Sequence, residues 1–144
     1  MIDINGIAHI QITAGIYEIA RAFYMQLLPF LGLKQVLDNE YGYYCVGSRT
    51  GVLISKPAPE HEGERFVQSR VGLHHVCFRA RSREDIDAAH VFVKALGAPV
   101  IRAPQGKTAG RRATTPSCSK TRTASVSRSI SFLARASSTR KQKP

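Results

Sequence analysis

The sequence GLHHVCFRA at residues 72–80 reads as a short β-strand that opens on two histidines. A similar sequence, GIAHIQIT, occurs at residues 6–13, where a glycine, a histidine and an apolar β-rich run follow in the same order. Each copy is followed by the apolar spacing of an amphipathic helix. Because internal repeats decide architecture before other signals do, we interpret the chain as two copies of one unit, in which a strand headed by histidine precedes a helix.

The first copy predicts a βαβββ module over residues 1–56. A strand at residues 7–13 precedes a helix at 16–28, which Pro29 and Gly32 end. Three short β-rich runs separated by turn residues follow, at residues 33–37, 41–46 and 52–56. Residues 57–71 are polar and predict a linker between modules.

The second copy occupies residues 72–104 and stops before its module is complete. After the strand at 73–80, Ser82 is the expected N-cap of a helix, and Asp85 stands in the position of a capping box. Residues 100–101 begin the next strand, and then the pattern ends. The predicted fold class is α+β, with paired βαβββ modules of which the second is incomplete.

The first strand has a polar face. With the two-residue period of a strand, His9, Gln11 and Thr13 share one face, and apolar residues occupy the other. A histidine on such a face indicates a lined cavity rather than simple exposure to solvent.

The net charge of +11 is concentrated at one end of the chain. Residues 1–104 hold 11 Lys or Arg against 10 Asp or Glu, whereas residues 105–144 hold 10 Lys or Arg and no acid. This tail has 14 Ser or Thr and poor strand periodicity, so we expect it to be disordered or poorly packed. It lacks a nucleic-acid motif, and we expect no specific nucleic-acid partner.

The remaining composition favours a cytoplasmic protein. No apolar run reaches the roughly 18 residues of a membrane span, and no secretory signal is visible. The three cysteines are odd in number and lack metal-type spacing, which is typical of free thiols in a reducing compartment.

The two modules, their leading histidines, and the segments AFY at 22–24, LGL at 31–33 and LHHV at 73–76 resemble the vicinal oxygen chelate superfamily. This group contains the glyoxalases, the bleomycin resistance proteins and the extradiol dioxygenases. The resemblance covers about residues 4–104 and implies a cup-shaped sheet around a divalent metal. It also implies pairing into homodimers.

The resemblance assigns roles to individual residues. It implies His9 and His75 as metal ligands, with His74 as an alternative to His75, and Zn, Ni, Mn or Fe as the ion. Three residues are implied as walls of the substrate cavity: Gln11, Tyr43 and Cys77. The implied function is a metal-dependent lyase, isomerase or dioxygenase acting on a small substrate with neighbouring oxygens. The alternative is a non-catalytic protein that binds a small molecule, as bleomycin resistance proteins do.

The tail departs from the family, which has three more strands and a glutamate ligand there. Codons can be chosen for residues 114–136 such that the frame one base earlier reads YYSVLFEDPDGIRLEINFVPGKG, the usual closing sequence of the family. We therefore hypothesise that residues from about Gly106 onward are a frameshifted product. The glutamate then overlaps the codon of Arg128, and we expect the closing strands and the metal site to be lost. An undisturbed DNA frame across codons 104–107 would contradict this hypothesis.

Overall fold

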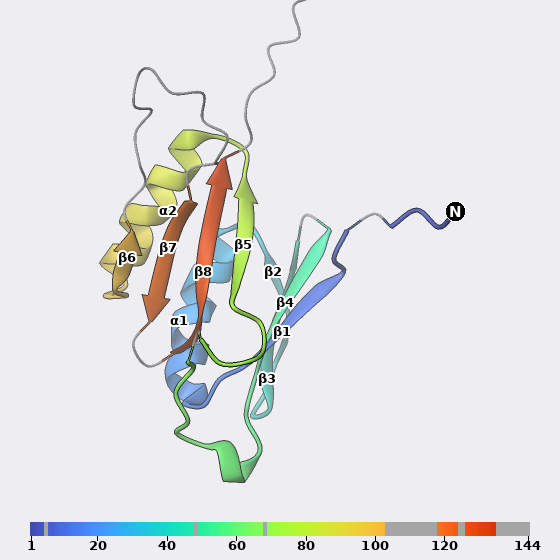
Figure 1. The fold of residues 1–144 in the computed structure, drawn as a ribbon, viewed down its shortest axis with the longest axis vertical. Coiled ribbons are helices and arrows are strands. Elements are labelled where there is room, and N and C mark those ends of the chain that lie inside the picture. The colour runs from blue at the N-terminus through green and yellow to red at the C-terminus, as the bar shows by residue number, and fades with distance from the viewer. Residues whose placement is uncertain (5, 48, 68, 103–117, 124–125, 135–144) are drawn as a thin grey trace, which may run out of the picture.

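Two similar halves make up the computed structural model, which describes all residues except 5, 48, 68, 103–117, 124–125 and 135–144 (Figure 1). The first half contains five elements in the predicted order, namely β1 (His9–Thr13), α1 (Tyr17–Phe30), β2 (Lys34–Asp38), β3 (Gly42–Gly47) and β4 (Thr50–Ser55). The second repeats them as β5 (His75–Ala80), α2 (Arg83–Ala95), β6 (Val100–Arg102), β7 (Cys118–Thr123) and β8 (Val126–Ala134). A short 3-10 helix, η1 (Pro59–His61), lies between the halves.

The strand order confirms the internal repeat. The first sheet has the order β1-β4-β3-β2, and the second has the corresponding order β5-β8-β7-β6. In each sheet the first strand of the module pairs in parallel with the last, and the other pairs are antiparallel. The α+β fold class with paired βαβββ modules is therefore confirmed.

The closing strands correct one expectation from the sequence. We expected them to be lost, but β7 and β8 form and complete a four-stranded second sheet. Within the basic tail that we expected to be disordered or poorly packed, residues 118–123 and 126–134 are strands. The other positions of that tail lie outside the described residues. The frameshift itself stays a hypothesis, because a fold does not report a reading frame.

Local chemistry explains where α2 begins. The Ser82 hydroxyl oxygen accepts a hydrogen bond from the Asp85 backbone N–H at 3.1 Å, and the Asp85 carboxylate accepts one from the Ser82 N–H at 3.0 Å. This reciprocal pair is the predicted capping box, and it satisfies two N–H groups at the start of the helix. In α1 the chain leaves the helix at Gly32, whose φ of 82° favours glycine.

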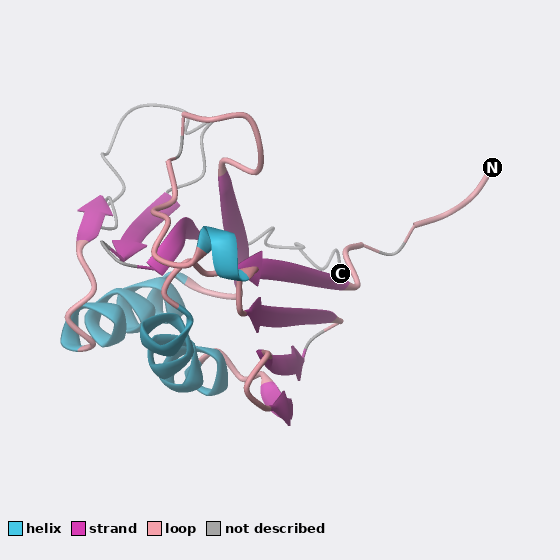
Figure 2. Ribbon diagram, turned by 90° about the horizontal axis from the view of Figure 1, so that it is seen from below, coloured by secondary structure: helices cyan, strands magenta, loops and turns pink. Residues whose placement is uncertain are grey.

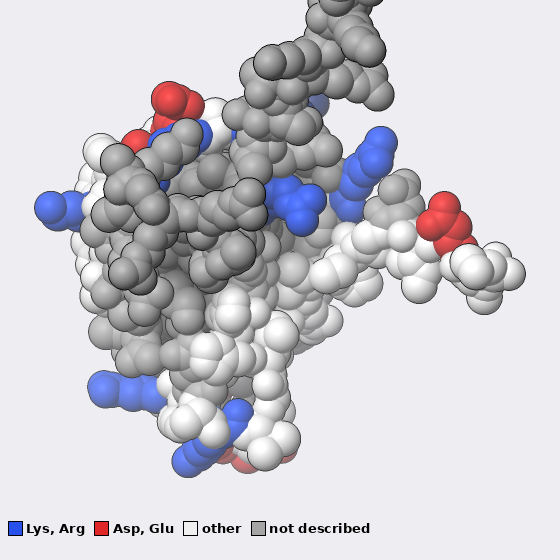
Figure 3. Space-filling view, turned by 45° about the horizontal axis from the view of Figure 1, so that its top comes forward, with Lys and Arg blue, Asp and Glu red and all other residues white. Residues whose placement is uncertain are grey.

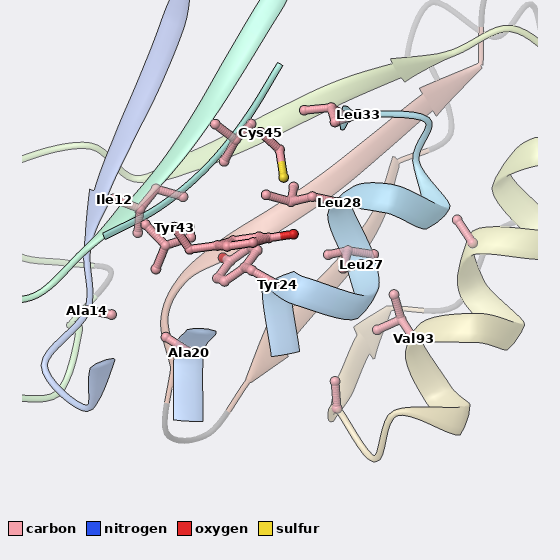
Figure 4. Packing of buried hydrophobic residues seen from close by; sticks show 14 of the residues in the cluster. Ile12, Ala14, Ala20, Tyr24, Leu27, Leu28, Leu33, Tyr43, Cys45 and Val93 are labelled. Carbon is pink, nitrogen blue, oxygen red and sulfur yellow. The ribbon is translucent and has the colours of Figure 1, made fainter. Parts of the chain in front are cut away.

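One apolar core lies beneath both modules. Buried side chains of the first sheet and α1 form a single cluster with Ile86, Ala89 and Val93 of α2. Figure 4 shows Leu27 of α1 pointing toward α2, which carries Val93. The helices lie side by side (Figure 2), and the rings of Phe30 and Phe92 stack between them with centroids 3.9 Å apart. This core fixes the positions of the strands that begin with His9 and His75.

Side-chain hydrogen bonds join α1 to the end of β2 and the turn that follows it. The Arg21 guanidinium donates two hydrogen bonds to the Asp38 carboxylate, at 2.8 and 2.6 Å. The Tyr17 hydroxyl donates to the Asn39 carbonyl at 3.1 Å. Elsewhere, the Lys and Arg side chains of the described residues are dispersed on the face seen in Figure 3. None of the helices in the described ranges is long and apolar enough to cross a membrane.

Candidate functional site

The outer face of β1 is polar, as the sequence predicts. Ile12 is buried at 2% exposure in the core, whereas His9, Gln11 and Thr13 are exposed on the other face. The alternation follows from the pleat of a strand, which turns successive side chains to opposite faces. We call the face of the first sheet that carries these three side chains the β1 face.

A buried hydroxyl group anchors this face. Ser55, at the end of β4, is only 8% exposed and is paired in register with Thr13. Its Oγ accepts a hydrogen bond from Gln11 Nε2 at 3.2 Å and lies 3.3 Å from Thr13 Oγ1. The sequence does not predict these hydrogen bonds of Ser55, because the pairing of β1 with β4 joins distant parts of the chain. The resulting chain of amide and hydroxyl groups can donate and accept hydrogen bonds.

Tyr44 supplies an aromatic wall next to His9. A side chain at Gly51 would place its Cβ 2.7 and 2.8 Å from two ring carbons of Tyr44, so the ring lies over the glycine. Gly51 is paired in register with His9, and Tyr44 is paired with Leu53, the partner of Gln11. Register partners share a face of the sheet, so Tyr44 and Leu53 belong to the β1 face.

Tyr43, which the resemblance implies as a cavity residue, does not lie on the β1 face. It is paired with Ile54, is 1% exposed, and packs in the core between the first sheet and α1. Cys45 shares that buried side. Burial raises the pKa of the Tyr43 phenol and of the Cys45 thiol above their usual values. Tyr43 is therefore a packing residue, and Tyr44 takes the position on the polar side.

The second candidate region is the start of β5. His75 is half-buried and His74 is exposed, and their Nδ1 atoms lie 2.8 Å apart. Their rings meet edge to face, with centroids 5.1 Å apart at 77°. Val76 turns into the core at 7% exposure, and half-buried Cys77 is two positions along the strand from His75. By strand alternation, Cys77 shares the His75 side of the sheet.

A three-ligand metal centre is not assembled in the part of the chain that the structure describes. No group of three or more His, Cys, Asp or Glu side chains gathers there at metal-binding distance. His9 and His75 each head the first strand of a module. Residue 128, where the frameshift hypothesis places the family's glutamate, is an arginine in this sequence. The side chains that the structure describes therefore do not form a complete site of two histidines and one carboxylate.

Comparison with known proteins adds an independent finding. A family model described as "Glyoxalase/Bleomycin resistance protein/Dioxygenase superfamily" matches residues 6–120. A putative glyoxalase from Bacillus halodurans is similar in structure, with a TM-score of 0.74 at 21% identity, covering 91% of this chain and 96% of that one.

Two further solved structures are similar. Lactoylglutathione lyase from Agrobacterium tumefaciens has a TM-score of 0.60 at 18% identity, covering 90% of this chain and 93% of that one. The fosfomycin resistance protein FosX from Listeria monocytogenes has a TM-score of 0.61 at 15% identity, covering 93% and 94%. At these identities the likeness concerns the fold alone. No curated protein matches the sequence.

Proposed function

Because this chain belongs to the glyoxalase, bleomycin resistance protein and dioxygenase superfamily, we propose that its frame-restored form is a divalent-metal-dependent enzyme of the lyase, isomerase or dioxygenase type. Its substrate would be a small molecule with two neighbouring oxygens, and His9 and His75 would be metal ligands. The observation that carries this proposal is their equivalence, since each begins the first strand of a module with the same strand order. Zn, Ni, Mn or Fe suits such a ligand set.

A glutamate at position 128 would lie opposite His75 only in a register of β8 shifted by one residue from the one in the structure. Here β8 pairs Ser129 with His75 and Ile130 with Val76, which is buried. The reconstructed reading has isoleucine in place of Ser129 and glutamate in place of Arg128. The isoleucine at position 129 of the reconstructed reading pairs with Val76 only if β8 is shifted by one residue along β5. The same shift sets the glutamate opposite His75, on the same face of the sheet.

For the present chain, without restoration of the frame, we propose that catalysis is lost. Ser129 is the residue paired with His75 in this chain, so no carboxylate stands opposite that histidine. The substrate-binding β1 face is retained, because Gln11, Thr13 and Ser55 belong to the first module and precede the hypothesised shift.

Metal content tests this proposal. The untagged chain, the frame-restored chain and the restored chain with His9→Ala are purified in parallel and measured by elemental mass spectrometry. We expect about one divalent ion per site only in the restored chain. The present chain carrying Arg128→Glu is the matched control, since it has the carboxylate without the register shift, and we expect it to bind less metal than the restored chain. Equal metal in all four proteins would contradict the ligand set.

A second function has one observation in its favour. A non-catalytic small-molecule binder needs no metal, and the described residues gather no three-ligand group while the Gln11–Ser55–Thr13 chain is in place. The discriminating measurement is ligand binding by the restored chain after chelation, with His9→Ala in parallel. Binding that survives both treatments favours the binder, and binding that both abolish favours the enzyme.

We also propose that the protein pairs as a homodimer. Among the described strands, β1 and β5 each lie at an edge of their sheet. Such edges expose unpaired backbone groups and favour pairing with another chain. Light scattering coupled to size-exclusion chromatography gives the mass directly, and a concentration-independent monomer would contradict this proposal.

A further inference from the structure

Tyr44 and Gly51 are in close contact beside His9, on the β1 face of the first sheet. Gly51 is the register partner of His9 on β4, one strand spacing or about 4.8 Å away. A Cβ at Gly51 would lie 2.7 and 2.8 Å from two ring carbons of Tyr44 and would also meet its hydroxyl oxygen. The end of the Tyr44 ring therefore occupies the space that a side chain at position 51 would fill, and its hydroxyl group lies next to the position of His9.

This contact exists because the Tyr44 side chain leans diagonally across the sheet. The register pairs Tyr44 with Leu53, and it pairs Gly51 with Val46. Tyr44 thus reaches a diagonal neighbour on the next strand, which is within the range of an aromatic side chain. A Cβ at position 51 would be closer to the ring than real Cβ atoms come, so any other residue there would displace the ring. Glycine at position 51 is therefore a condition for this placement of Tyr44.

The Tyr44 ring lies at the boundary between a polar and an apolar part of the β1 face. The polar part is on β1, where His9 and Gln11 are exposed. The apolar part is on β2 and β3, where Leu37 and Val46 are exposed and belong by register to the same face as Tyr44. A molecule bound across this boundary meets hydrogen-bonding groups at one end and apolar surface at the other.

We propose that Tyr44 and Gly51 determine the substrate specificity of the β1 face, and that they select a substrate with an aromatic group next to its two neighbouring oxygens. This inference rests on the proposed function, which places the substrate beside His9. Aromatic rings attract one another in offset-stacked or edge-to-face contacts, and the Tyr44 ring offers such a contact directly beside that histidine. The Tyr44 hydroxyl group can also donate a hydrogen bond to an oxygen of the substrate.

Two vicinal diols that differ only in the attached group test this proposal. Propane-1,2-diol carries a methyl group, and 1-phenylethane-1,2-diol carries a phenyl group. Their dissociation constants are measured by nuclear magnetic resonance titration of the full, untagged chain. We expect the phenyl compound to bind about tenfold more tightly, which corresponds to roughly 60 Å² of additional apolar surface removed from water. In Gly51→Ala the displaced ring should reduce this preference to less than about threefold.

Further variants separate the ring contact from general damage to the fold. Tyr44→Phe keeps the ring and should keep the preference for the phenyl compound, whereas Tyr44→Val should lose it. Gly51→Ala added to Tyr44→Val should cause no further loss, because no ring remains to be displaced. Tyr41→Val is the matched control, since Tyr41 is an exposed tyrosine between β2 and β3, and it should bind as the unmodified chain does. Circular dichroism verifies that each variant is folded.

Equal affinity of the unmodified chain for the two diols, or binding of neither, would overturn this inference. A preference for the phenyl compound that survives Tyr44→Val would also overturn it, because the phenyl group then binds elsewhere. The metal content of the restored chain is measured independently of the diols. If that chain holds its metal but the two diols bind equally, the ligand set stands and this inference fails. If it holds no metal and the preference still depends on Tyr44, the proposed enzyme fails and this inference stands.

Discussion

Replacing Leu27 by alanine tests whether one core supports both modules. Leu27 is 1% exposed and points from α1 toward α2 (Figure 4). Truncating a fully buried leucine costs the transfer free energy of its lost atoms plus a cavity, which is about 2–5 kcal/mol in total. Alanine is a better helix former than leucine, so the loss comes from packing and not from the helix itself. We expect the free energy of unfolding to fall by about 3 kcal/mol.

This magnitude is decisive for a domain of this size. Domains are stable by about 5–15 kcal/mol, and each 1.4 kcal/mol changes the ratio of folded to unfolded molecules tenfold. The matched control is Ile19→Ala on the same helix, because Ile19 is 48% exposed. We expect the control to change stability by less than about 0.5 kcal/mol.

The assay is urea unfolding followed by circular dichroism, together with hydrogen exchange resolved by peptide. If the core is shared, Leu27→Ala speeds exchange of the slowest amides in β5 and α2 as well as in the first module. A loss below about 1 kcal/mol, or one equal to that of Ile19→Ala, would refute the packing argument. Faster exchange confined to residues 1–56 would refute the shared core and leave two independent modules.

Three further predictions concern individual side chains. Ser55→Ala removes the acceptor of the Gln11 amide and should lower the free energy of unfolding by about 1 kcal/mol in urea titrations, with no change in far-ultraviolet circular dichroism. Burial raises the pKa of the Cys45 thiol, so its contribution to stability is complete below the unfolded value of about 8.5 and is lost as pH rises through the folded value. The free energy of unfolding should therefore change less between pH 7 and 10 in Cys45→Ala than in the unmodified chain. The same change in both proteins would contradict burial of the thiol. The hydrogen bond that His61 Nδ1 donates to the Glu64 carboxylate raises the pKa of His61, so its contribution to stability is present below about pH 6.5 and is lost as pH rises through the raised value. The pKa of His61 measured by nuclear magnetic resonance should fall in Glu64→Gln.

Periodicity explains which parts of the fold could be predicted. The repeat of a strand and a helix, the polar face of β1 and the capping box of Ser82 and Asp85 all depend on local spacing, and each is found. Tyr43 shows the limit of such reasoning. Alternation puts Tyr43 and Tyr44 on opposite faces, but it does not say which face is covered by a helix. Only the register that pairs Tyr43 with Ile54 decides, and that pairing joins distant parts of the chain.

The closing strands were missed for a related reason. A strand is recognised by the alternation of its residues, and SVSRSISF at residues 125–132 does alternate, with serine at every second position. The composition of the tail, which is basic and rich in Ser and Thr, predicts disorder, whereas this alternation predicts a strand. In the structure, β8 pairs with both β5 and β7, so the pattern decided the local structure and the composition did not.

The frameshift hypothesis accounts for the survival of this pattern. A serine codon that begins with TC places T at the middle of the overlapping codon, and a middle T encodes an apolar residue. Each serine at positions 125, 127, 129 and 131 then marks an apolar residue of the restored strand, I, L, I and F in turn. The two-residue period is kept, but its phase is inverted. Period determines whether a strand forms, whereas phase determines which side chains face the core and which face a ligand. Under this hypothesis, a shifted frame preserves the strand and its pairing while it removes the carboxylate that we propose as the third metal ligand.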